Sequence, residues 1–154
     1  MKSYPVFGDM DMADTTIAEL MVKDHERIAK LLKDLTCCLD GTPETVNKVF
    51  NNLRWDIEKH FVLEEKSIFI HIDSGDDDLF KKMQVLLKEH ERIKDLVRNV
   101  QVDLDNDRKI DVDELVKSLE RHKNFEDSSF YPELDKQLND DQKRGIRGSM
   151  VSCV

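Results

Sequence analysis

The stretch Asp24-His25-Glu26-Arg27-Ile28 occurs a second time, with one acid exchanged for another, as Glu89-His90-Glu91-Arg92-Ile93. Each copy is followed by a histidine with a glutamate four residues later, in His60-Phe61-Val62-Leu63-Glu64 and in His122-Lys123-Asn124-Phe125-Glu126. The first histidine recurs after 65 residues (25 to 90) and the second after 62 (60 to 122). A repeat of chemically active residues, and not only of apolar ones, indicates a site built from two matching halves.

The composition favours a single helical domain. A chain of 154 residues is long enough to bury one core, and only 5 glycines and 3 prolines argue against a turn-rich β fold. The net charge of −9 disfavours nucleic acid and anionic membranes as partners. No apolar run is long enough to predict a membrane span, and no signal peptide is visible. The three cysteines have no metal-finger spacing, so we expect reduced thiols in a cytoplasmic protein.

Apolar residues recur at steps of three and four along four segments, which predicts four amphipathic helices. Thr16, three residues before Glu19, fits a capping box at the start of the first helix. Thr42 and Pro43 fit the cap and the first position of the second helix. Breaks between the four helices are expected at Gly41, at Ser74-Gly75-Asp76 and from Asp103 to Asp107, with the last helix opening near Asp111.

Short loops between such helices make neighbours in the sequence antiparallel. The predicted fold is therefore all-α: an antiparallel up-down-up-down four-helix bundle over residues 15–138, with an N-terminal arm (1–14) and a short C-terminal tail (139–154). Pro132 should kink or limit the fourth helix. A short helix is possible within the tail, near residues 141–146.

Six polar residues fall on the apolar stripes and should point into the core. A buried carboxylate without a partner costs several kcal/mol or becomes neutral, but metal cations among these side chains would compensate them together. Histidine and glutamate four residues apart lie about 40° apart on a helix and converge on one point. The candidate metal ligands are His25, His60, Glu64, His90, His122 and Glu126.

Two such half-sites, related by a rough two-fold axis, would hold two metal ions, each with two imidazoles. The two glutamates could bridge the ions, which would lie ~3.5–4 Å apart as in other two-metal sites. Imidazole with carboxylate suits iron, zinc, manganese or cobalt. The ferritin-like di-iron pattern needs a glutamate three residues before a histidine. It is not present, because the five residues three before the histidines are Val22, Ile57, Ile68, Leu87 and Leu119.

From about His25 to Leu134 the chain resembles the hemerythrin family in its HHE cation-binding form. The resemblance rests on the two D/E-H-E stretches, on the two His-x-x-x-Glu pairs, and on Phe130-Tyr131-Pro132. It implies a four-helix bundle around two non-haem iron ions bridged by oxo or hydroxo. It also implies that the four repeated histidines bind iron and that Glu64 and Glu126 are the bridges.

The chain departs from the oxygen-carrying members of that family in two places. Those members have a further histidine on the third helix, four residues from the counterpart of His90, where this chain has Leu86 and Lys94. They also use an acid five residues after the fourth-helix histidine, which here is Asp127. The internal repeat favours Glu126 as the bridge, with Asp127 as the alternative. The missing histidine opens the metal positions and argues against simple reversible oxygen carriage.

Several other residues have weaker signals. His71 lies too far along the second helix to join the same centre, and we expect it at a helix end or on the surface. Trp55 and Tyr131 are expected to be core or bundle-end aromatics. Four acids beside the stripes could accept a ring N–H from a ligand histidine or could simply be solvated: Glu26, Glu65, Glu91 and Asp127.

Three functions remain open at this point. The leading one is a cytoplasmic di-iron protein that binds O₂ or a related small ligand for sensing, storage or scavenging. The second is an enzyme that acts on peroxide or nitric oxide, or that donates iron for the repair of iron–sulfur centres. The third is an iron-responsive interaction module whose bundle folds only with metal.

Overall fold

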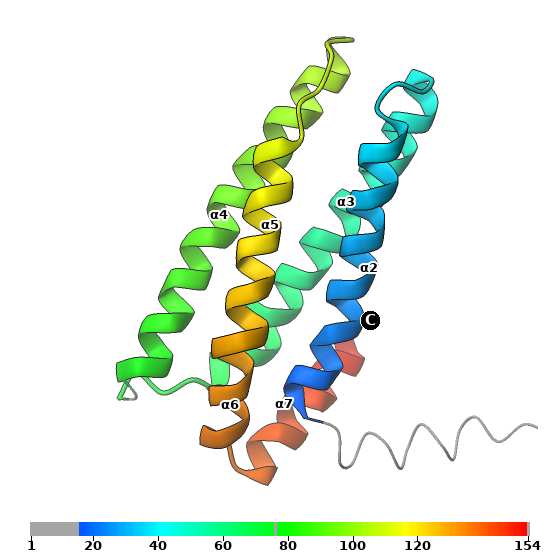
Figure 1. Ribbon diagram of the computed structural model, residues 1–154. Helices are drawn as coiled ribbons and strands as arrows, with labels where there is room; N and C mark the ends of the chain where they lie inside the picture. The colour runs from blue at the N-terminus through cyan, green and yellow to red at the C-terminus, as the bar shows by residue number, and fades with distance from the viewer. Residues whose placement is uncertain (1–15, 76, 154) are drawn as a thin grey trace, which may run out of the picture.

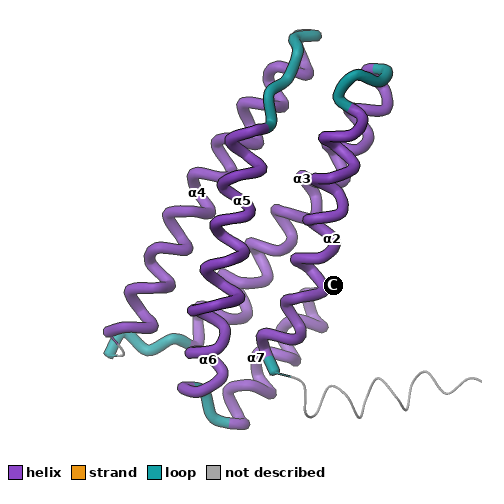
Figure 2. Tube along the Cα trace, in the orientation of Figure 1, coloured by secondary structure: helices purple, strands orange, loops and turns teal. Residues whose placement is uncertain are grey.

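The computed structural model describes residues 16–75 and 77–153, and this part of the chain is all-α, with no β-strand. Four long helices lie side by side and are connected at alternating ends (Figure 1). Loops are confined to the ends of these helices (Figure 2). The predicted N-terminal arm lies outside the described residues. The four helices are α2 (Ile17–Cys38), α3 (Pro43–Leu63), α4 (Asp77–Asp105) and α5 (Asp113–Phe125).

The predicted helix starts are confirmed for the first two helices. The Thr16 side chain accepts a hydrogen bond from the backbone N–H of Glu19 and caps α2. Thr42 caps α3 in the same way through the N–H of Thr45, and Pro43 occupies the first turn, where its missing N–H costs nothing. The fourth helix begins at Asp113, two residues after Asp111, and its N-cap is Val112. The carboxylate of Asp111 accepts a hydrogen bond from the backbone N–H of Asp113.

The sequence did not predict the π-helical segments that continue α3 and α5. These segments are η1 (Glu64–Ile68) and η3 (Glu126–Phe130), and each begins at a glutamate of the repeat. The backbone N–H groups of Phe69 and Tyr131 reach back five residues to the carbonyls of those glutamates. Such widened turns are rare and occur often at functional sites. The repeat therefore extends to the backbone conformation.

The described residues form three further elements. They are η2 (Phe69–His71), α6 (Tyr131–Gln137) and α7 (Asp140–Cys153). Pro132 limits α5 as expected, because it lies in the first turn of a new helix that follows the π-helical segment. The helix expected near residues 141–146 is present but much longer, and α7 buries Ile146 against the bundle.

Two apolar clusters form the core, on either side of a polar layer. One cluster contains residues of all four long helices, in the upper part of the bundle as drawn in Figure 1. It includes Phe50 and Phe61. The other lies toward α6 and α7 and includes Tyr131, which is fully buried as expected. The expectation for Trp55 was wrong, since this side chain is 67% exposed on α3. No helix among the described residues is long and apolar enough to cross a bilayer.

We predict that Asp135→Ala lowers the free energy of unfolding by about 1–2 kcal/mol. The carboxylate of Asp135, in α6, accepts hydrogen bonds from the backbone N–H groups of Ile17 (3.0 Å) and Ala18 (3.3 Å), which have no partner within α2. Chemical denaturation would measure the change. Asp40→Ala, at an exposed position, is the control, and an equal loss in both variants would contradict this capping role.

Candidate metal centre

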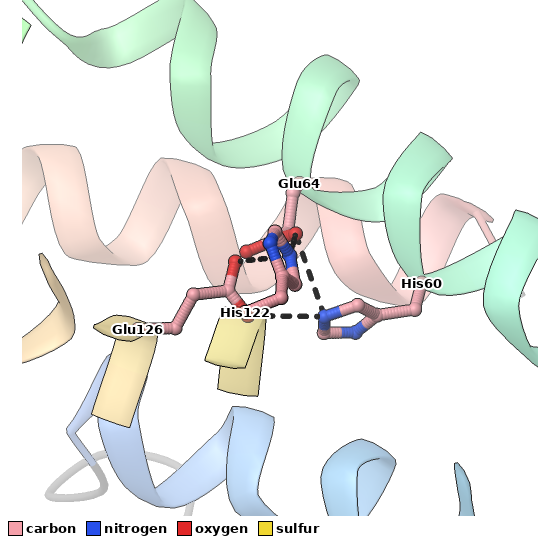
Figure 3. A group of neighbouring side chains, drawn as sticks. All are labelled: His60, Glu64, His122 and Glu126. Atoms are coloured by element: carbon pink, nitrogen blue, oxygen red, sulfur yellow. Dashed lines mark ion pairs between the residues drawn. The ribbon is translucent and has the colours of Figure 1, made fainter. Parts of the chain in front are cut away.

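The six predicted ligands meet in the polar layer between the two apolar clusters. All are buried: His25, His60, Glu64, His90, His122 and Glu126. Four of them, the two His-x-x-x-Glu pairs on α3–η1 and α5–η3, each offer one donor atom within 4.8 Å of the others. Figure 3 shows these pairs converging, His60 and Glu64 from one side and His122 and Glu126 from the other.

The two remaining histidines join this group through the glutamates. The Nε2 atom of His25 lies 2.9 Å from Oε1 of Glu126, and that of His90 lies 3.0 Å from Oε1 of Glu64. Since His25 and His90 are repeat counterparts, as are the glutamates, the two contacts are equivalent. The structure thus brings all six residues together, with every Nε2 atom directed at the same small volume.

The Nδ1 atom of each of the four repeated histidines faces a carboxylate on a neighbouring element of the bundle. Asp24 of α2 accepts from His60 (3.3 Å), and Glu65 of η1 accepts from His90 (2.7 Å). In the other half, Glu89 of α4 pairs with His122 (2.7 Å), and Asp127 of η3 pairs with His25 (3.0 Å). A carboxylate on Nδ1 fixes the ring orientation and leaves Nε2 free to bind a metal.

These contacts show which of the four acids with an undecided role accept a hydrogen bond from a histidine ring and which are solvated. Glu65 and Asp127 orient histidines, whereas Glu26 and Glu91 are exposed, and Glu91 pairs with Lys94. Asp127 faces the outer side of its histidine, while the fully buried Glu126 faces the inner side. This arrangement favours Glu126 over Asp127 as a metal ligand.

Sequence reasoning missed two orienting acids, Asp24 and Glu89. Both directly precede a histidine of the repeat, so the signal was present in the D/E-H-E stretches. An acid next to His25 or His90 in the sequence points away from that ring on the helix. It therefore reaches the histidine of the following helix instead, which spacing within one helix could not indicate.

Buried atoms without a hydrogen-bond partner indicate that these residues could bind a cation. Among the described residues, four buried side-chain atoms have no hydrogen-bond partner. Three of them lie here, Nε2 of His60, Nε2 of His122 and Oε2 of Glu126, and the fourth is Nε2 of His71. Buried polar atoms are almost always satisfied, so three such atoms in one place need an explanation. Imidazole nitrogen and carboxylate oxygen are ligands for iron, zinc and related metals, and a bound ion would satisfy all three.

The charges of the site also indicate a position for cations. Burial by itself lowers the pKa of His60, but the carboxylates of Glu64 and Asp24 outweigh burial and raise this pKa to about 10. Burial likewise opposes a charged His122, yet Glu126 raises its pKa well above the usual value. Without metal, the site therefore holds protons at neutral pH. Metal must displace these protons, so metal affinity should increase with pH up to about 10.

One difference breaks the symmetry of the two halves. The hydroxyl of Tyr131 donates to Oε2 of Glu64 at 2.5 Å, within the buried layer. The repeat counterpart of Tyr131 (131 to 69) is Phe69, which has no hydroxyl to donate to Glu126. Oε2 of Glu126 accordingly has no hydrogen bond, although it lies 3.2 Å from Nε2 of His122. Glu64 is therefore held by a hydroxyl as well as by His90, whereas the hydrogen bond and ion pairs of Glu126 at the centre are with histidines.

His71 lies apart from the centre, as its position on the second helix predicted. It is the last residue of η2, at a helix end, and its ring approaches Gly145 of α7. It lines a separate cavity of about 590 Å³ together with Asp73 and Gln142. It is not among the converging donor atoms.

The comparison with protein families gives the class of the chain. The model of the hemerythrin HHE cation-binding domain matches residues 16–142, which include all four helices and both halves of the site. The chain therefore belongs to the hemerythrin HHE family, as the resemblance implied. Comparison with curated proteins and with solved structures found no match.

We predict that His60→Ala or His122→Ala removes bound metal and lowers the free energy of unfolding by about 3 kcal/mol or more. Each change leaves buried carboxylates without their partner. Metal analysis and chemical denaturation would measure both effects. The control is His71→Ala, which should keep its full metal content. Equal metal loss in His71→Ala and His122→Ala would show that these donor atoms do not form the site.

We also predict that Glu89→Gln weakens metal binding by about 10- to 100-fold, because the ring of His122 loses its charged partner. Glu91→Gln is the matched control, two residues along α4, where the side chain is 70% exposed. Competition with a chelator would measure the affinities. The orienting role of Glu89 is wrong if both variants bind metal as tightly as the unchanged protein.

Proposed function

We propose that this protein binds two non-haem iron ions, bridged by oxo or hydroxo, and through them O₂ or a related small ligand. The scaffold would be the antiparallel up-down-up-down four-helix bundle of its family. The observation that carries the proposal is the convergence of four buried histidines and two buried glutamates around unpaired donor atoms. Such a pair of ions supplies redox-capable positions for a small ligand when it is bound.

The contacts suggest how the residues divide between the two ions. His25 and His60 both approach Oε1 of Glu126, at 2.9 and 3.5 Å. His90 and His122 both approach Oε1 of Glu64, at 3.0 and 3.8 Å. Each pair of imidazoles would hold one ion, with the glutamates between the ions. Six protein ligands for two ions leave positions open for an exogenous ligand.

The surroundings favour sensing or scavenging over reversible oxygen storage. The positions that flank His90 on α4 are Leu86, which is fully buried and cannot bind metal, and Lys94, which pairs with Glu91. No fifth imidazole therefore completes the site among the described residues. We place the protein in the cytoplasm, an assignment supported by the unpaired thiols of Cys37 and Cys38.

Turnover of peroxide or nitric oxide is the second candidate function. It is favoured by a groove of about 410 Å³ that reaches three of the histidines and is far larger than oxygen storage needs. Catalytic loss of peroxide or nitric oxide by the iron-loaded protein would distinguish this function from simple ligand binding.

We predict about two irons per chain in protein purified from iron-replete cells, and a fast reaction of the reduced protein with oxygen. With only two imidazoles per ion, the oxidised state should form within minutes, and no adduct should release oxygen on degassing. Metal analysis and absorption spectra before and after air would measure both results.

Three outcomes would contradict this proposal in different ways. Metal content near zero would exclude a metal centre. Two zinc ions per chain would keep the site but exclude redox binding of oxygen. An adduct that persists for hours and releases oxygen would restore the carrier function.

A further inference from the structure

A groove of about 410 Å³ runs between α2 and α5, two of the helices labelled in Figure 1. Its floor reaches His25, His60 and His122. Its walls are mainly aliphatic. They are formed by Ile28 and Leu32 on α2 and by Val116 and Leu119 on α5. Ligand sites typically have this size, this apolar lining and a few polar groups, whereas a diatomic gas needs only about the space of one water molecule, roughly 30 Å³.

The internal repeat supplies a comparison groove in the same molecule. The counterpart of the α2–α5 groove lies between α3 and α4, and it measures only about 70 Å³ and reaches no histidine. Two substitutions fill it. Arg54 replaces Val116 (116 to 54), and Lys94 replaces Ala29 (29 to 94). Arg54 also extends to Gln101 across the groove, at 3.4 Å, which holds its long side chain in place.

A third difference screens one half of the centre. Phe61 stacks on the ring of His90, with ring centroids 3.8 Å apart. The counterpart of Phe61 is Lys123 (61 to 123), which is exposed and leaves His25 open to the groove. The two halves of the centre therefore have matching donor atoms but different access. Among the described residues, the space beside the centre is about 410 Å³ on the α2–α5 side and about 70 Å³ on the α3–α4 side.

The rim of the open groove indicates the charge of its ligand. Lys33 lies on α2 eight residues beyond His25, about 12 Å along the helix, and Lys123 lies at the histidine end. Neither ammonium group forms an ion pair with a described residue. Glu120 is the acid on the same rim, so two cations stand against one anion in a protein whose net charge is −9. This local excess favours an anionic group.

We propose that the α2–α5 groove binds a medium-chain aliphatic monocarboxylate. Its carboxylate pairs with Lys33, its chain lies between the aliphatic walls, and its far end reaches the histidines. The distance from Lys33 to the level of His25 is about that of an extended decanoate chain. The inference rests on the proposed function in one respect, that the histidine end is the metal centre, whereas binding to the walls requires no metal chemistry.

Titration calorimetry of the metal-loaded, full-length protein with decanoate, below its micelle concentration, tests the proposal. Decanoate should bind at least tenfold more tightly than decanol, which lacks the charge, and than acetate, which lacks the chain. Ala29→Trp should weaken decanoate binding at least tenfold by filling the groove, and Lys33→Glu should do so by reversing the charge. Both positions are exposed, so folding should be preserved.

The repeat provides a matched control for each variant. Lys94→Trp and Arg98→Glu make the same changes beside the closed groove and should leave decanoate binding unchanged. The proposal would be overturned if the protein bound decanol as tightly as decanoate. It would also be overturned if Ala29→Trp bound decanoate as tightly as the unchanged protein. A dimer that dissociates on Ala29→Trp would overturn it too, because a second copy would then cover the groove. If the protein binds decanoate but fails the iron and oxygen tests, the proposed function is contradicted and this inference is supported.

Discussion

The structure depends on how two buried glutamates and four buried histidines are compensated at the centre of an apolar bundle. Glu64 and Glu126 are fully buried, between two clusters of aliphatic and aromatic side chains. Such groups are costly in a low-dielectric interior unless they are paired. Two sets of contacts offset this cost. The outer carboxylates hydrogen-bond the histidine rings, and a cation would bind the inner donor atoms.

The outer carboxylates also connect the helices. Each of the four elements that carry these acids supplies one to a histidine of the next, so α2 is joined to α3, η1 to α4, α4 to α5 and η3 to α2. A histidine that shifts on one helix must break a hydrogen bond to another. The same contacts that orient the site therefore fix the register of the helices around it, and the position of the metal donors is coupled to the packing of the whole bundle.

Much of this arrangement could be predicted from the sequence, because the stripes and the repeat are local patterns. The stripes place His25 and His60 in the core, and the caps at Thr16 and Thr42 set the helix starts. Contacts between helices were harder to predict from the sequence. The partners of Asp24 and Glu89 lie on neighbouring helices, and no spacing within a single helix reveals them.

The π-helical segments and α7 were missed for different reasons. A π-helical turn adds one residue without changing the apolar pattern enough to be recognised in five residues. The tail after Asn139 is polar, with a weak stripe, so its helix forms largely because Ile146 is buried against the bundle. Trp55 shows the opposite error, since this aromatic residue was expected in the core or at a bundle end and lies exposed along α3.

The repeat explains the donor set, while the departures from it explain how the two halves can differ in function. Tyr131 fixes Glu64, but Phe69 cannot fix Glu126. Phe61 covers His90, but Lys123 leaves His25 open to the groove. Both departures act in the same direction. The half with Glu64 and His90 is fixed and screened, and the half with Glu126 and His25 is the less constrained and more accessible one. A ligand that enters from solvent therefore meets the side of the centre where the glutamate pairs with histidines, while the hydroxyl of Tyr131 donates to Glu64 on the other side.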